Sequence, residues 1–197
     1  MAPETDVTTR TVDGAEYPAV GTYALDTMHT TLGFTVRHMA VSKVRGAFNK
    51  FEGTIEVAEK PEDSKVSVTI EAGSVDTRDE NRDNHLRTND FFDVENHPTW
   101  TFVSTAIKPE SPTEWQLVGD LTIRGVTKSV TLDAVLEGVV KDPYGMHRVG
   151  FSARTSINRE DFGIAFGALM EAGGLVVAKK VDIEIEAEAT LLSLIHI

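Results

Sequence analysis

The 197-residue chain contains no cysteine. This absence excludes a disulfide framework, a cysteine-ligated zinc site, an iron–sulfur cluster and a thiol nucleophile. A basic excess is missing as well, because 31 Asp and Glu outnumber 19 Lys and Arg and leave a formal net charge of −12. Contact with phosphates needs a basic face, so no nucleic-acid partner is expected. The net charge also argues against adsorption to anionic membrane surfaces.

Long apolar runs are missing too. No stretch approaches the roughly 20 apolar residues of a membrane-spanning helix, so no integral membrane segment is expected. The first residues show neither the basic start nor the apolar centre of a secretory signal, which predicts a cytoplasmic protein. Residues 1–18 are polar, contain Pro3 and Pro18 and show no periodicity. They are therefore expected to form a flexible arm.

Signatures of catalysis and metal binding are also absent. The sequence contains no GxSxG, no HExxH, no HxH and no phosphate-binding loop, although a hydrolase can lack such a motif because triads are defined by geometry. His29 and His38 lie on one extended stretch with opposite parity, so they are expected to face opposite sides. We therefore expect no metal, no cofactor and no catalytic residues.

What the sequence does contain is alternation of apolar and polar residues with a period of two. Residues 181–188 read VDIEIEAE, and Val66, Val68 and Ile70 share one face of another such segment. This pattern is typical of antiparallel strands with one solvated face. The apolar parity slips between Phe48 and Phe51, which predicts a bulge near 49–50. The expected strands are about 22–26, 30–40, 44–57, 65–72, 99–107, 114–124, 128–140, 147–157 and 178–191.

Two segments depart from this alternation. Residues 78–90 are highly charged and suit a short solvated helix, and residues 161–174 place apolar residues at helical spacing. Many strands with few helices predict an all-β fold, either a closed up-and-down barrel or a sandwich. The apolar tail 192–197 could extend the last strand or be an artefact of gene calling.

Several ordered motifs resemble the YceI-like family, the lipocalin-like polyisoprenoid-binding proteins of bacteria. The most specific is RDNHLRTNDFFDV at 82–94. Their order and spacing hold over about 21–191. The other matching stretches are 23–30, 32–38, 44–53, 74–77, 119–128 and 159–163.

The resemblance implies an up-and-down antiparallel β-barrel of about eight strands, with two short helices, over residues 19–191. It implies a tunnel that holds a long-chain isoprenoid, such as an isoprenoid quinone, or a similar amphiphilic lipid. His85, Arg82 and Arg159 would contact a head group, whereas Phe91 and Phe92 would anchor the first helix. The expected lining residues are Phe34, Val36, Phe48, Phe51, Phe102, Phe151, Phe162 and Phe166.

Three functions remain open from the sequence. The first is a lipid carrier without catalytic activity. The second is an enzyme that acts on a hydrophobic substrate at the barrel mouth, using His and Asp. The third is a filled barrel that serves as an interaction module. A homodimer is compatible with each of them.

Overall fold

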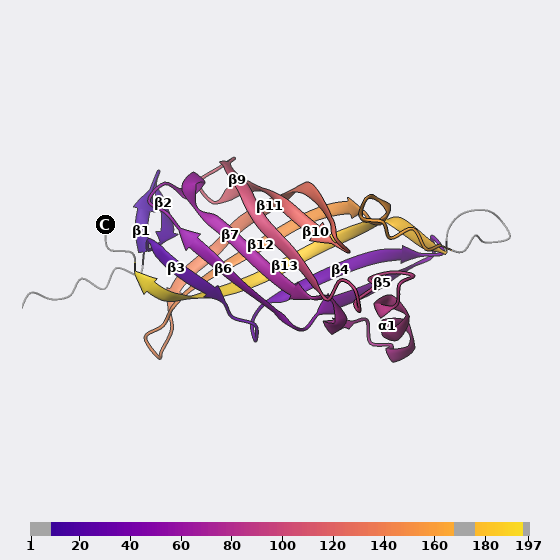
Figure 1. Ribbon diagram of the computed structural model, residues 1–197. Helices are drawn as coiled ribbons and strands as arrows, with labels where there is room; N and C mark the ends of the chain where they lie inside the picture. Colours follow the sequence, from indigo (N-terminus) through magenta and orange to yellow (C-terminus); the bar gives the residue numbers. More distant parts are fainter. Residues whose placement is uncertain (1–8, 168–175, 195–197) are drawn as a thin grey trace, which may run out of the picture.

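The alternating segments form strands that build one elongated antiparallel barrel (Figure 1). The computed structural model describes residues 9–167 and 176–194. The strands within these ranges are β1 (Thr9–Val12), β2 (Ala15–Pro18), β3 (Gly21–Leu25), β4 (Thr31–His38), β5 (Ser42–Phe48), β6 (Phe51–Val57), β7 (Lys65–Glu71), β8 (Val75–Asp76), β9 (Thr99–Pro109), β10 (Glu114–Ile123), β11 (Val126–Lys141), β12 (His147–Asn158) and β13 (Val177–Leu194).

Eight strands close the barrel. The order β3-β6-β7-β9-β10-β11-β12-β13 returns to its start because β13 pairs with both β12 and β3. All of these pairings are antiparallel, and most join strands that follow one another in the chain. The structure thus confirms the up-and-down barrel and excludes the sandwich.

The β4–β5 hairpin lengthens the barrel at one end. β13 pairs with β3 through residues 189–194 and with β4 through residues 177–186. The break between β5 and β6 falls at Asn49 and Lys50, where the parity slip predicts an irregularity. Their backbone N–H groups are bonded to the carbonyl and the hydroxyl of Ser74 instead of a neighbouring strand.

The opposite end carries a second, two-stranded sheet formed by β1 and β2. Tyr17 and Pro18 of this hairpin are buried, and the Tyr17 ring packs edge-on against Trp115 at a centroid distance of 5.8 Å. The Tyr17 hydroxyl donates to the carbonyl of Pro112. The predicted flexible arm is therefore wrong for residues 9–18, because these apolar contacts hold the hairpin on the barrel. Residues 1–8 lie outside the described ranges.

The helices are short. α1 (Glu80–Arg87) lies within the predicted segment 78–90, and Asp79 caps it by accepting from the Arg82 N–H at 3.0 Å. The second predicted helix, 161–174, does not form in the part that is described. A 3₁₀ turn (Arg159–Phe162) ends at Gly163, which has a φ of 76°, and residues 164–167 are irregular. Residues 168–174 lie outside the described ranges. Other 3₁₀ turns are Pro61–Asp63 and Ala72–Ser74.

Two hydrophobic clusters occupy the interior, one toward each end. The cluster beside α1 includes Phe48, Phe92 and Trp100, with the Phe92 and Trp100 rings 4.7 Å apart. The cluster beside β1 and β2 includes Tyr17, Tyr23 and Trp115. No helix in the described ranges is long and apolar enough to cross a membrane.

Candidate functional site

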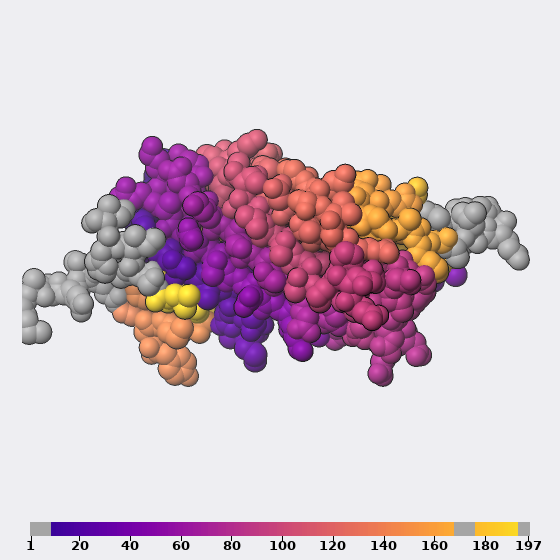
Figure 2. Space-filling model, viewed as in Figure 1, coloured from indigo at the N-terminus to yellow at the C-terminus, as the bar shows by residue number. Residues whose placement is uncertain are grey.

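A cavity of about 590 Å³ lies inside the barrel and is lined by residues of both clusters. Its wall is made by inward positions of the strands, such as Val181, Ile183 and Ile185 on β13. The acidic residues between them, Asp182 and Glu184, point outward because successive strand residues face opposite sides. On the face shown in Figure 2, the side chains of the strands and α1 form a continuous wall over the barrel. The period-two pattern thus produces both the acidic exterior and the apolar interior.

The inward apolar residues are incompletely covered. Phe34 and Val36 of β4 and Ile183 and Ile185 of β13 all line the cavity, yet none reaches full burial. In a filled barrel such residues would be in contact with one another on every side. Their remaining exposed surface faces the hollow interior, so the structure contradicts the filled-barrel alternative.

The charged groups in the wall have one sign. The lining includes Arg10 toward the β1–β2 end and Arg82 and Arg159 toward the α1 end, and it includes no Asp or Glu among the described residues. The chain as a whole has many more acids than bases. The cavity therefore presents cations and apolar surface in a protein that is otherwise acidic.

Arg159 is the most deeply buried of these cations, with only 4% of its surface exposed. Its guanidinium donates to the backbone carbonyls of Ile164 (2.6 Å), Ala178 (3.0 Å) and Val177 (3.2 Å). Burial lowers its pKa from the ordinary arginine value. Glu160 acts on it electrostatically, but no carboxylate within the described ranges forms a salt bridge with it. Its hydrogen bonds go to backbone carbonyls, so its charge is available to an anionic ligand.

Arg82 is held at the start of α1 by Thr77. Its Nε donates to the Thr77 hydroxyl at 2.7 Å and its Nη2 to the Thr77 carbonyl at 2.8 Å. The buried carboxylate of Asp83 accepts from the N–H and the hydroxyl of the same threonine. Thr77, Arg82 and Asp83 thus form one network that fixes the Arg82 guanidinium against the cavity wall.

The cavity meets solvent at the α1 end. His85 and Phe166 are the lining residues of the described ranges that are classed as exposed. Their rings are 5.2 Å apart in an edge-on arrangement, and both contact Phe91. His85 Nε2 lies 2.8 Å from a carboxylate oxygen of Asp90. We refer to this region, formed by His85, Phe91 and Phe166, as the mouth.

Ten of the eleven predicted site residues lie on the cavity wall. The exception is Phe51, which is the first residue of β6 and directly follows the break at 49–50. Its cross-strand partner Ile70 lines the cavity, whereas Phe51 does not. The sequence reasoning missed Phe92 and Phe91, which line the cavity in addition to packing beside α1. It recognised the alternation in β7 and β13 but did not name their inward aliphatic residues as lining residues, although the same parity argument applies to them.

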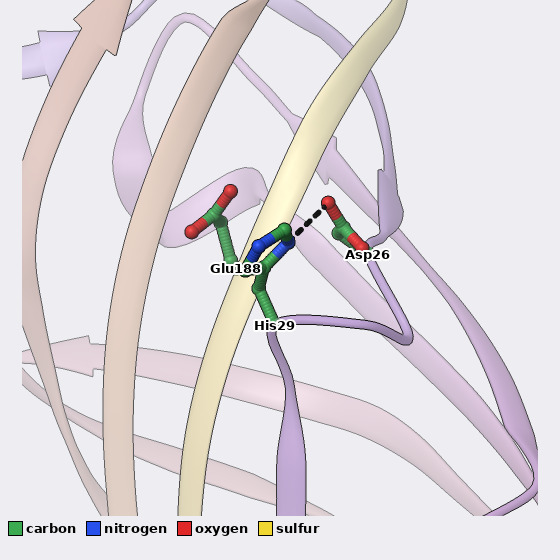
Figure 3. A group of neighbouring side chains, drawn as sticks. All are labelled: Asp26, His29 and Glu188. Carbon is green, nitrogen blue, oxygen red and sulfur yellow. Dashed lines mark hydrogen bonds and ion pairs between the residues drawn. The ribbon is translucent and has the colours of Figure 1, made fainter. Parts of the chain in front are cut away.

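A separate polar cluster lies away from the cavity, where Asp26, His29 and Glu188 come together (Figure 3). His29 Nδ1 is 2.9 Å from Asp26 Oδ2. The Arg148 guanidinium donates to Asp26 at 2.7 Å, to Asp142 at 2.7 Å and to Glu188. The sequence considered His29 only with His38 and did not predict this cluster. Arg148 already supplies the positive charge among the carboxylates.

The hydrogen bond from His29, and then that from Arg148, lower the pKa of Asp26 to about 2. Arg148 likewise lowers the pKa of Asp142, and the three carboxylates raise the pKa of Arg148. The cluster therefore keeps Asp26, Asp142 and Arg148 charged at neutral pH. It joins the loop after β3 to β12 and β13 on the outside of the barrel.

The YceI-like domain profile matches residues 23–189, which cover nearly the whole barrel. The chain belongs to the YceI-like family. A YceI-like relative from Staphylococcus epidermidis, named UPF0312 protein, is 39% identical over 171 residues, which are 86% of this chain and 97% of the relative. A UPF0312 protein from Pectobacterium atrosepticum is 44% identical over 137 residues, covering 69% of this chain and 71% of the relative.

Solved structures share the YceI-like barrel. The YceI protein of Campylobacter jejuni superposes with a TM-score of 0.68 at 33% identity, covering 86% of this chain and 97% of that chain. BcnA of Burkholderia cenocepacia gives a TM-score of 0.74 at 25% identity, covering 84% and 99%. A polyisoprenoid-binding domain from Saccharophagus degradans gives 0.64 at 15% identity, covering 86% and 98%, and so shares the fold.

Proposed function

We propose that this YceI-like protein binds and carries an amphiphilic lipid, an isoprenoid or a lipid with a similar long chain. The apolar cavity of about 590 Å³ is the observation that carries the proposal. A volume of this size is typical of small-molecule sites, which cover roughly 300–1,000 Å³. The polyisoprenoid-binding domain of Saccharophagus degradans, which has the same fold, supports an isoprenoid as the ligand.

The size of the cavity limits the length of the enclosed chain. If one chain carbon needs about the volume of a water molecule in the liquid, roughly 30 Å³, the cavity corresponds to a chain on the order of 20 carbons. Each buried CH₂ contributes about 0.8 kcal/mol, so affinity comes mainly from the chain. One methylene more or less then changes affinity by only about fourfold, so chains of similar length compete.

The charged groups in the wall support a head group at the α1 end. Arg82 and Arg159 lie there beside the mouth, and the described lining provides no carboxylate for a cationic head group. Guanidinium groups bind phosphate and carboxylate through charge-assisted hydrogen bonds. In this orientation, the chain of the ligand extends toward Tyr17 and its anionic or acceptor-rich head group lies beside Arg159.

The first test is to identify the ligand of purified protein by native mass spectrometry and organic extraction. We expect a co-purified lipid, or micromolar binding of a fluorescent probe that carries a long isoprenoid chain. Failure of both measurements would refute the carrier. The same incubation with an ester of that chain tests for turnover, since His85 is paired with Asp90 at the mouth. Steady ester hydrolysis that His85→Ala abolishes would favour the enzyme instead.

The second test concerns the head group and uses pairs of ligands that differ only there, such as oleic acid and oleyl alcohol. We expect Arg159→Met to weaken oleic acid binding more than oleyl alcohol binding. Arg10→Met is the matched control, because Arg10 also lines the cavity but lies toward the β1–β2 end. An equal loss of affinity for the acid and the alcohol would show that Arg159 only supports the backbone segments whose carbonyls it binds, the start of β13 and Ile164.

A further inference from the structure

The β4–β5 hairpin has a charge opposite to that of the whole protein. Residues 27–51 contain four Lys and Arg and no Asp or Glu, in a chain with a net charge of −12. Arg37, Lys43 and Arg45 of this hairpin are all exposed. The hairpin lies at the α1 end of the barrel, where the cavity opens (Figure 1). The net charge of the chain therefore does not describe the surface of this hairpin.

These cations share the outer face of the hairpin. Val36 and Val44 line the cavity, so the alternate positions Arg37 and Lys43 point outward. Arg37 and Lys43 are direct cross-strand partners, and like charges in such pairs destabilise a sheet. Asp182 faces this strip from β13, where it pairs with Thr35.

Asp182 interacts electrostatically with Lys43 but offsets only part of this positive charge. Its carboxylate is already engaged by Lys180, at 3.0 Å, and by the Ser156 hydroxyl. Neither Arg37 nor Lys43 forms a salt bridge within the described ranges. The outer face of the hairpin is therefore complementary to an anionic partner.

The tip of the hairpin exposes apolar side chains, and the backbone conformation of its turn is unfavourable for the residues that occupy it. Met39 and Ala40 have φ values of 52° and 56°, a conformation for which hairpin turns normally use Asn or Gly. Met39 is 43% exposed and Val41 is 86% exposed. Isolated exposed apolar residues need no explanation. Here, however, they lie between flanking cations at the end of a strand that lines the cavity.

We propose that the β4–β5 hairpin docks the mouth of the barrel on an anionic lipid bilayer. Met39 and Val41 enter the interface, while Arg37, Lys43 and Arg45 contact the phosphates, the combination that holds peripheral proteins on membranes. The proposal rests on the proposed lipid carriage, because docking at this end brings Phe166 and the mouth to the surface from which a lipid would enter.

Vesicle flotation tests the docking surface. The protein is expected to float with vesicles of phosphatidylcholine and phosphatidylglycerol, and much less with phosphatidylcholine alone. Lys43→Ala combined with Arg45→Ala should lower the partition coefficient roughly thirtyfold, since each cation near an anionic surface contributes about 1 kcal/mol. Tyr144→Asp is the control, because Tyr144 is an exposed apolar residue on the β11–β12 turn at the opposite end. Failure of the wild-type protein to float would overturn the proposal.

A double substitution separates docking from folding. Met39→Asn with Ala40→Gly gives the turn residues that tolerate positive φ, so the melting temperature should rise. The same change removes apolar surface from the tip, so flotation should weaken. A variant that is more stable and still floats like the wild type would contradict insertion of the tip.

Uptake of a water-soluble fluorescent lipid without vesicles distinguishes this proposal from the carrier function. The hairpin variants should retain uptake of the free lipid. Failure of the wild-type protein to take up lipid would contradict the carrier function without testing membrane docking, which flotation measures. Analytical ultracentrifugation adds a further outcome. If the wild-type protein is a dimer and Val41→Asp makes it a monomer, the hairpin binds a second copy of the chain and the bilayer proposal is wrong.

Discussion

Arg148 connects carboxylates from three separate parts of the chain. Asp26 follows β3, Asp142 follows β11 and Glu188 belongs to β13, and all three accept from one guanidinium. Removing the cation would leave three negative charges close together on the barrel wall, which is unfavourable. The cluster is therefore an ion-pair network that links the chain segments that close the barrel.

The pH dependence of stability tests the contribution of this ion-pair network. The pKa of Asp26 in the folded state, about 2, lies below the value of roughly 3.9 for an unfolded Asp. The stabilisation from ionised Asp26 is thus complete above about pH 4 and is lost as the pH falls toward 2. Asp26→Asn should therefore reduce the difference in urea midpoint between pH 7 and pH 3. Asp120→Asn, on the exposed surface of β10, serves as the control.

Substitution by Ala should have different effects at Gly119 and at Gly46, because the added methyl group would contact different atoms at each position. A Cβ on Gly119 would lie 2.7 Å from the Val103 carbonyl and 2.4 Å from the Phe102 ring. Backbone atoms cannot yield easily, so Gly119→Ala should cost about 1–3 kcal/mol in chemical denaturation.

Gly46→Ala should affect the cavity more than stability. Its Cβ would lie 2.4 Å from the end of the Phe34 ring and 2.9 Å from the Thr77 methyl group. Phe34 lines the cavity and can swing into it. We expect weaker uptake of a long-chain probe, with a smaller loss of stability than Gly119→Ala produces. The opposite ranking of the two stabilities would show that Phe34 is not free to move.

At the scale of elements, the β1–β2 hairpin closes the end of the barrel opposite the mouth. Tyr17, which is 6% exposed, packs on Trp115 and bonds to Pro112. Tyr17→Ala should lower the free energy of unfolding by about 3 kcal/mol. It should also speed release of a bound probe by opening that end, as measured by stopped-flow competition. Unchanged release would show that ligands leave only through the mouth.

The elements differ in how well the sequence predicted them. The long strands were predictable because burial on one face imposes a period of two, as in residues 181–188. The β1–β2 hairpin was missed because its segments are only four residues each and their apolar side chains are few. The second predicted helix is wrong in its described part, 161–167, because Phe162 and Ile164 are buried by packing against the barrel end rather than along a helix face.

At the scale of the whole molecule, the hollow interior separates a binding barrel from a filled one. The sequence correctly predicted that apolar residues such as Phe34 and Phe102 face inward, but it did not predict the space between them. That space depends on the number of strands in the ring and on the summed volumes of all inward side chains. A local pattern contains neither quantity, so the cavity was implied by the family resemblance and became visible only in the closed structure.

Filling the middle of the cavity tests its role directly. Ala153 faces inward and pairs with Ala134 and Ile185, which also line the cavity. Ala153→Phe should keep or raise thermal stability, because the new ring fills empty space. Binding of a 20-carbon chain should fall far more than binding of a 10-carbon chain. Val103→Phe, on the exposed face of β9, adds the same bulk outside and should leave both affinities unchanged.

The pairing of β13 has a consequence for the order in which the protein is made. β13 bonds to β12 on one edge and to both β3 and β4 on the other, so no closed ring exists without it. During synthesis, the strands before β13 emerge from the ribosome with two unpaired edges and an apolar inner face. The β3 and β4 edges are paired only through contacts with residues far apart in the chain, which form slowly. The nascent chain is therefore most prone to aggregation in the interval before its last strand appears.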